Sequence, residues 1–181
     1  MPHFLTISGS PNKFSKTAFL LRTIAKRLDA QGLELRAVHA ADLERSFTNH
    51  LIQLYLGDFN QLVQQAEAII LLTPMGTGND PGLLAPLLDL LPDNAFAGKP
   101  VLLVATGSPS ERVSELQQTY AAEFQRLQAT LLQPALHIGS RAWIIVGDDP
   151  PKLVRGAEER LAAALREAQA HAQGRWTAAA A

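Results

Sequence analysis

Short apolar runs alternate with helical apolar patterns along most of the chain. Residues 68–72 are five consecutive apolar residues, which is typical of a strand buried on both faces. Residues 16–31, in contrast, repeat apolar side chains at helical spacing, and Gly32 suits the end of that helix. Because strand-like and helix-like segments alternate, the pattern predicts βαβ units and therefore a parallel sheet covered by helices.

The same patterns place the individual elements along the sequence. Strands are expected at residues 3–8, 33–38, 68–72 and 101–105, with a fifth inside residues 135–146, where Gly139 and Ser140 are a candidate interruption. Helices are expected at residues 16–31, 58–66, 83–91, 114–131 and 152–172, whereas residues 40–57 have no clear pattern. We therefore expect one α/β domain at residues 1–173 and a frayed, Ala-rich tail at residues 174–181.

Composition and charge narrow the class of protein. The formal net charge of −1 lacks the basic excess that is usual in nucleic-acid-binding proteins, so we expect no nucleic-acid partner. The absence of cysteine excludes disulfides, thiolate nucleophiles and iron–sulfur clusters. The first residues do not resemble a secretory signal and no apolar run reaches membrane-spanning length, so we expect a cytoplasmic protein without a membrane partner.

Side chains for hydrolytic or metal chemistry are not arranged for it in the sequence. The five histidines have no metal-ligand spacing, and no Gly-x-Ser-x-Gly motif is present. We therefore assign no metal ligand and no catalytic acid, base or nucleophile. This pattern is compatible with an enzyme in which a bound cofactor carries the chemistry.

Three loops rich in small and hydroxyl residues follow strands of the expected sheet, at residues 8–15, 73–82 and 106–112. In a doubly wound sheet such loops meet at the carboxyl ends of the strands, where ligands bind. The first loop leads into the first helix, whose free backbone N–H groups and dipole favour a phosphate.

The first loop has the composition of a phosphate site. Gly9 allows a turn, and hydroxyl or charged side chains follow at Ser10, Ser15, Lys16 and Thr17. In the alternative interpretation, Ser15 only caps the helix and residues 10–12 form an ordinary turn. The loop taken alone leaves both interpretations open.

Three motifs occur in a characteristic order between about residues 5 and 110. The first has the form Gly-Ser-Pro-x-x-x-Ser-x-x-x-x-Leu-Leu and is filled by Gly9, Ser10, Pro11, Ser15, Leu20 and Leu21. The second comprises Thr73-Pro74, Gly82, residues 87–92 and Gly98-Lys99, and the third is Ala105-Thr106-Gly107. With these motifs the chain resembles the NAD(P)H-dependent FMN reductases, and most closely the alkanesulfonate-associated ones.

The resemblance implies a flavodoxin-like, doubly wound, five-stranded parallel sheet with the strand order 2-1-3-4-5. It also implies hydride transfer from NADPH or NADH to FMN, with a flavin-dependent monooxygenase as one candidate recipient of reduced flavin. The FMN phosphate would be held by Ser8, Ser10, Asn12, Ser15, Lys16 and Thr17. The ring would be contacted by Pro74, Met75, Gly76, Thr77, Gly78, Thr106, Gly107 and Ser108.

The resemblance further implies a homodimer or homotetramer. The helices expected at residues 83–91 and 114–131 favour the same assembly, because they carry more apolar residues than a one-sided helix needs, including Tyr120 and Phe124. We therefore expect self-association through these helices.

The expected ring site departs from the family pattern at three positions. Gly76 stands where the family usually has an aromatic residue, Ala85 replaces a usual lysine, and Pro109 lies in a loop where relatives more often carry two glycines. Met75 can still offer the ring an apolar contact. A second hypothesis therefore stays open: a degenerate, non-enzymatic flavodoxin-like protein with a binding or structural role, or a flavin carrier.

Overall fold

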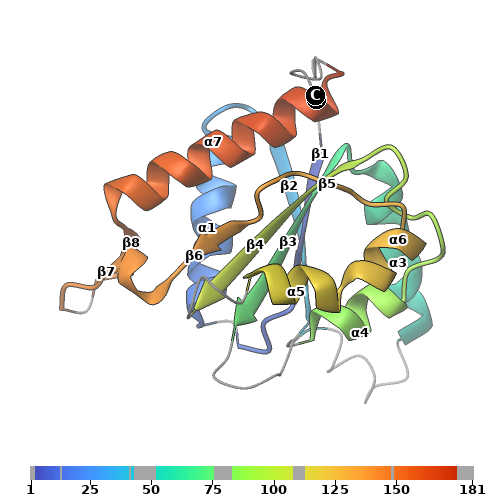
Figure 1. Ribbon diagram of the computed structural model, residues 1–181, viewed down its shortest axis with the longest axis horizontal. Coiled ribbons are helices and arrows are strands. Elements are labelled where there is room, and N and C mark those ends of the chain that lie inside the picture. Colours follow the sequence, from blue (N-terminus) through green and yellow to red (C-terminus); the bar gives the residue numbers. More distant parts are fainter. Residues whose placement is uncertain are drawn as a thin grey trace.

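The central layer of the molecule is a parallel β-sheet (Figure 1). The computed structural model describes residues 3–12, 14–40, 42, 52–75, 83–107, 113–147 and 149–174, without the side chains of residues 52–55, 113 and 114. The strands are β1 (His3–Ser8), β2 (Glu34–His39), β3 (Ala68–Met75), β4 (Pro100–Gly107), β5 (Thr130–Leu131) and β6 (Leu136–Ile138). Their order is β2-β1-β3-β4-β5, with β6 also paired to β4, which confirms the predicted order.

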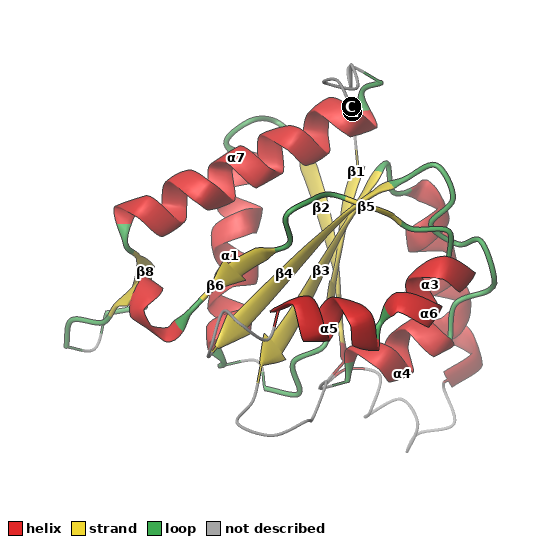
Figure 2. Ribbon diagram, viewed as in Figure 1, coloured by secondary structure: helices red, strands yellow, loops and turns green. Residues whose placement is uncertain are grey.

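Helices cover both faces of this sheet (Figures 1 and 2). One face carries α1 (Lys16–Asp29) and α7 (Arg155–Ala172). The other carries α3 (Ile52–Gln65), α4 (Leu84–Asp89), α5 (Val113–Thr119) and α6 (Ala121–Arg126). Among the described residues, no helix combines the length and the apolar character needed to cross a bilayer.

The two-sided cover explains the continuous apolar runs in the central strands. Successive side chains of a strand point to opposite faces. In β3, Ile70 packs with the α1 and α7 side of the core, whereas Ile69 and Leu71 pack with the α3 and α4 side. All three side chains are fully buried, which favours apolar residues on both faces of the strand.

The largest difference from the sequence-based expectation lies after residue 113. The single helix expected at residues 114–131 is divided into α5 and α6, and its last residues form β5 beside the start of β4. Gln128 adopts a φ of 54° after α6, although no glycine marks this helix end in the sequence. Residues 130–131 therefore pair in the sheet, where hydrogen bonding to β4 outweighs their helical spacing.

The expected fifth strand is also shorter than predicted. It consists of β6, and the chain leaves the sheet at Gly139 to enter a 3-10 turn at Ser140–Ala142, so the candidate interruption is confirmed. Two short strands, β7 (Trp143–Ile144) and β8 (Lys152–Leu153), then form a separate antiparallel pair. This hairpin projects beside the first turn of α7 (Figure 2), and α7 begins three residues later than predicted, at Arg155.

Candidate functional site

The three expected loops meet at the carboxyl edge of the sheet, as far as the structure describes them. β3 continues to Met75, so Pro74 and Met75 are strand residues and not the start of a loop as predicted. The register of β3 and β4 sets Pro74 beside Thr106 and Met75 beside Gly107. The second and third sets of expected flavin contacts are therefore neighbours across one strand pair.

Gly9 joins the first loop to the second. Its N–H donates to Leu72 O at 2.8 Å, and its carbonyl accepts from Leu83 N–H at 3.1 Å. A Cβ at this position would lie 2.7 Å from Cβ and 2.8 Å from the backbone nitrogen of Leu84, at the start of α4. Only glycine lets the first loop pack this closely against α4.

Hydrogen bonds within the first loop shape the start of α1. Ser15 caps the helix, because its Oγ accepts from Ala18 N–H at 3.2 Å. The same Oγ lies 2.8 Å from Ser10 Oγ, and Asn12 Oδ1 accepts from Phe14 N–H at 2.8 Å. The helix cap expected at Ser15 is thus confirmed. It leaves the helix end available to a ligand, as the remaining donors show.

Several donors at this helix end have no acceptor among the described residues. They are the backbone N–H groups of Ser10, Lys16 and Thr17. The half-buried Lys16 side chain has no ion pair with a described residue, and the buried Ser8 Oγ, at the end of β1, has no described hydrogen-bond partner. Donors without a described acceptor and a cation at a helix N-terminus fit the phosphate of FMN.

A buried hydroxyl pair links the first and third loops. Thr17 Oγ1 and Thr106 Oγ1 are 2.6 Å apart, and both residues are almost fully buried. The two hydroxyls satisfy each other, which a buried polar group requires. The side chain of Thr17, which the resemblance places at the phosphate, thus also connects α1 to the end of β4.

Gly107 and His137 shape the end of β4. Gly107 has a φ of 114°, and a Cβ there would lie 2.4 Å from Met75 O, so the position requires glycine. His137 Nε2 lies 2.9 Å from Gly107 O and, as the N–H tautomer, donates to it. Sequence reasoning gave His137 only a structural role, and no local pattern indicates that its side chain reaches a flavin loop.

The rest of the expected site is divided between the described and undescribed parts of the chain. Gly76, Thr77, Gly78 and Ser108 lie outside the described residues, as do Gly82 and Pro109.

Lys99, a residue of the second motif, is not near the site: its Nζ donates to Gln64 O at 3.1 Å and to Ala66 O, just after α3. Burial lowers the pKa of Lys99, and Glu67 partly opposes that shift.

Together, the sheet order and the loops at its carboxyl edge define a flavodoxin-like α/β protein. Its fold is similar to that of the apo form of an NADH:FMN oxidoreductase (EMOB), with a TM-score of 0.72 and 22% identity over 96% of this chain and 90% of that one. The family model for NADPH-dependent FMN reductases matches residues 2–142. The chain belongs to this family of oxidoreductases, which confirms the family suggested by the three motifs.

Relatives within the family differ in the nucleotide that their names give. An FMN reductase (NADPH) of Pseudomonas putida is 31% identical over 160 residues, covering 87% of this chain and 81% of the relative. An NADH-dependent FMN reductase, SfnF, of Pseudomonas putida is 27% identical over 149 residues, covering 77% of this chain and 78% of the relative. Family membership therefore supports FMN and a nicotinamide nucleotide as ligands and leaves open which nucleotide is preferred.

Proposed function

We propose that this chain reduces FMN with NADPH or NADH at the carboxyl edge of its sheet, with the FMN phosphate on the loop between β1 and α1. The observation that carries the assignment is that the N–H groups of Ser10, Lys16 and Thr17, in and after the first loop, have no acceptor among the described residues. Bound FMN supplies the hydride-accepting atom, N5 of its ring, and the protein contributes binding and orientation. No protein acid or base is needed for that transfer.

Each loop has a distinct task in this proposal. The hydroxyl-rich first loop holds the phosphate, with Ser8, Asn12 and Ser15 as further contacts. Pro74 and Met75, both partly exposed, face the ring together with residues 76–78. Thr106, Gly107 and Ser108 meet its far edge, where Gly107 lets the backbone approach closely.

The phosphate assignment is tested by comparing FMN with riboflavin, which lacks the phosphate. Lys16→Ala should weaken FMN binding about five- to tenfold, because a charge-assisted contact from this half-buried side chain contributes about 1 kcal/mol. Riboflavin binding should be unchanged. Lys26→Ala, near the other end of α1, is the matched control and should leave both affinities unchanged. Equal losses of FMN and riboflavin binding after Lys16→Ala would contradict the assignment.

The rival function is a flavodoxin-like protein that does not turn over flavin. This hypothesis rests on Gly76, which stands where the family usually has an aromatic residue. Losing one aromatic stack on the flavin ring costs roughly 0.5–1.5 kcal/mol, or about tenfold in affinity. Such a loss weakens a flavin site without abolishing it, so we place the reductase first. Titration with FMN, followed by flavin fluorescence, and FMN-dependent oxidation of NADPH and NADH separate the two. No binding up to about 1 mM would favour the rival.

Assembly, partners and location rest on the resemblance and on the sequence patterns. We propose a homodimer or homotetramer, a single domain at residues 1–173 with a tail at residues 174–181, and a cytoplasmic protein that can supply reduced flavin to a monooxygenase. Tyr120 and Phe124, which favoured self-association in the sequence, are buried within the chain's own core and give this assembly no support. Exposed apolar side chains at Phe14, Ile144, Ile145 and Val146 are better candidates for a contact. Light scattering at micromolar concentration tests it, and a monomer would refute it.

A further inference from the structure

A second hollow adjoins the flavin loops on the side of α7. It has a volume of about 580 Å³, within the range of small-molecule sites. Its walls come from the end of β4, from β6, from the 3-10 turn and from the first turns of α7. Gly107 is part of its wall, and the same residue meets the ring edge in the proposed function.

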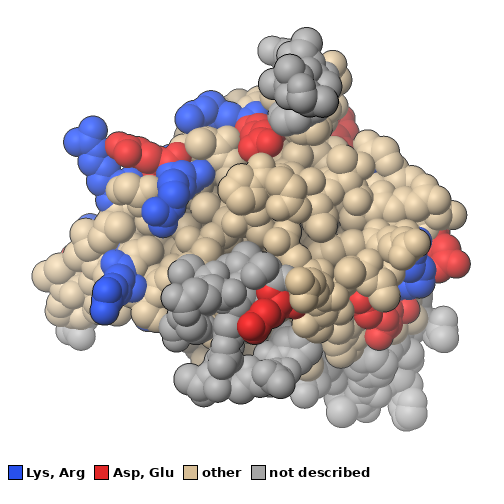
Figure 3. Space-filling view, in the orientation of Figure 1, with Lys and Arg blue, Asp and Glu red and all other residues tan. Residues whose placement is uncertain are grey.

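Two arginines line this hollow, Arg141 on the 3-10 turn and Arg160 on α7. Both are exposed, and neither has an ion pair or hydrogen bond with a described residue. His137, at the same wall, is the third basic side chain. Figure 3 shows several Lys and Arg side chains over α7 and the neighbouring segment, with Asp and Glu side chains beside some of them.

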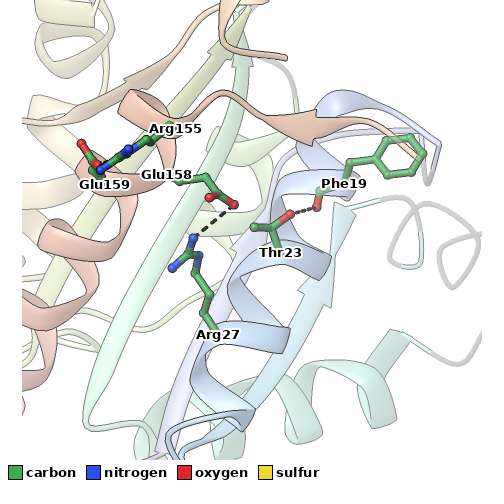
Figure 4. A network of polar contacts seen from close by, with 6 residues as sticks. All are labelled: Phe19, Thr23, Arg27, Arg155, Glu158 and Glu159. Atoms are coloured by element: carbon green, nitrogen blue, oxygen red, sulfur yellow. Dashed lines mark hydrogen bonds and ion pairs between the residues drawn. The ribbon is translucent and has the colours of Figure 1, made fainter. Parts of the chain in front are cut away.

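The acidic residues closest in sequence to Arg160 do not neutralise it. Glu158 pairs with Arg27 of α1 at 3.2 Å, and Glu159 pairs with Arg155 at 2.9 Å (Figure 4). Both carboxylates thus already have basic partners, and none of the described residues that line the hollow is acidic. The described lining therefore carries positive charge without an acidic partner, and such charge attracts an anion.

We propose that this hollow binds a phosphate group of the nicotinamide nucleotide, with Arg141 and Arg160 as its ligands. This inference rests on the proposed function, in which the nucleotide must bring its reactive carbon to about 3–3.5 Å from the flavin. A basic hollow that shares Gly107 with the ring site is placed to hold the charged part of the same molecule. Guanidinium groups suit the task, because their donors match phosphate oxygens in pairs.

The test measures nucleotide binding directly. The full chain, saturated with FMN, is titrated with NADP⁺ and with NAD⁺ by calorimetry, so that no turnover occurs. Arg141→Ala and Arg160→Ala should each weaken binding about tenfold, the lower range for a charge-assisted contact. Arg160→Lys, which keeps the charge but loses the paired donors, should lose less. Arg155→Ala, whose side chain is 92% exposed and paired with Glu159, is the matched control and should bind like the wild type.

The two nucleotides distinguish the two phosphates that could occupy the hollow. A loss for NADP⁺ alone assigns the 2′-phosphate, and an equal loss for NAD⁺ assigns the pyrophosphate; either result supports the proposal. Unchanged affinity for both nucleotides overturns it, as does a loss of FMN affinity without a loss of nucleotide affinity. If wild-type affinity is too weak for calorimetry, the KM values for NADPH and NADH in FMN reduction give the same comparison.

Failure of this inference is separate from failure of the proposed function. A wild-type chain that binds FMN and oxidises NADPH, with arginine variants that are unaffected, refutes the phosphate hollow alone. A wild-type chain that binds no FMN refutes the reductase whatever the arginine variants do. Thermal unfolding of each variant verifies that the exposed substitutions leave the fold intact.

Discussion

Replacing Gly9 by alanine should disturb two binding loops at once, because this residue is fixed on both sides. Its backbone is bonded to Leu72 and Leu83. The new Cβ would lie 2.7 Å from Leu84 Cβ, about 0.7 Å short of the 3.4 Å at which ordinary contact begins. The nearest atoms include backbone of α4, so no side-chain rotation relieves the clash.

The cost can be worked from these contacts. Overpacking of this kind costs about 1–3 kcal/mol, and weakening one hydrogen bond of Gly9 adds about 0.5–1.5 kcal/mol. We expect a loss of about 2–4 kcal/mol in the free energy of unfolding. For a chain of this size that corresponds to a fall in Tm of roughly 5–15 °C. FMN affinity should fall as well, since the displaced loop carries the phosphate donors.

Calorimetry or circular dichroism of Gly9→Ala and Gly57→Ala measures this effect with a matched control. Gly57 lies within α3, and a Cβ there would meet nothing within 4 Å. Gly57→Ala should therefore raise the free energy of unfolding by about 0.5–1 kcal/mol, through helix propensity. A Gly9→Ala protein that unfolds within 1 °C (about the error of the measurement) of the wild type would refute the packing argument.

Two further predictions concern the buried polar contacts. Thr17→Val and Thr106→Val should each destabilise the fold by about 1–3 kcal/mol, because each leaves the other hydroxyl buried without a partner. The double variant should lose less stability than the sum of the two single losses. Denaturant unfolding measures all three losses, and additive losses would contradict a direct bond between the hydroxyls. Because burial lowers the pKa of Lys99 below its usual value near 10.5, the unfolded chain binds that proton more tightly. The free energy of unfolding of the wild type, relative to that of Lys99→Met, should therefore rise with pH just below 10.5. If the free energies of unfolding of the two proteins change with pH in parallel, the prediction is wrong.

The sequence predicts the centre of the sheet better than its edge. Residues 3–8 are recognised to the residue, because Phe4, Leu5 and Ile7 form a short apolar segment that ends in a Gly-Ser-Pro loop. Residues 130–131 and 152–153 are missed, because two-residue strands are too short to show a period and are set by their partners.

The candidate site also has a part that the sequence predicts and a part that it does not. The first loop is predictable, since a helix start, a glycine and hydroxyl residues are neighbours in sequence. The bond between Thr17 and Thr106 joins residues 89 positions apart, and the contact of His137 with Gly107 spans 30. The hollow with Arg141 and Arg160 likewise exists only after the 3-10 turn and α7 are placed side by side. Contacts of this kind depend on the folded chain and leave no local pattern.

The position of α7 in the sequence has a consequence for synthesis of the protein. Ile70, Leu102 and Val104 pack in the same core cluster as Leu161 and Leu165 of α7, yet they are made at least 50 residues earlier. Until α7 leaves the ribosome, one face of an already translated sheet has no cover in that region and exposes aliphatic side chains. Such intermediates aggregate readily, so the nascent chain is expected to depend on chaperones late in translation.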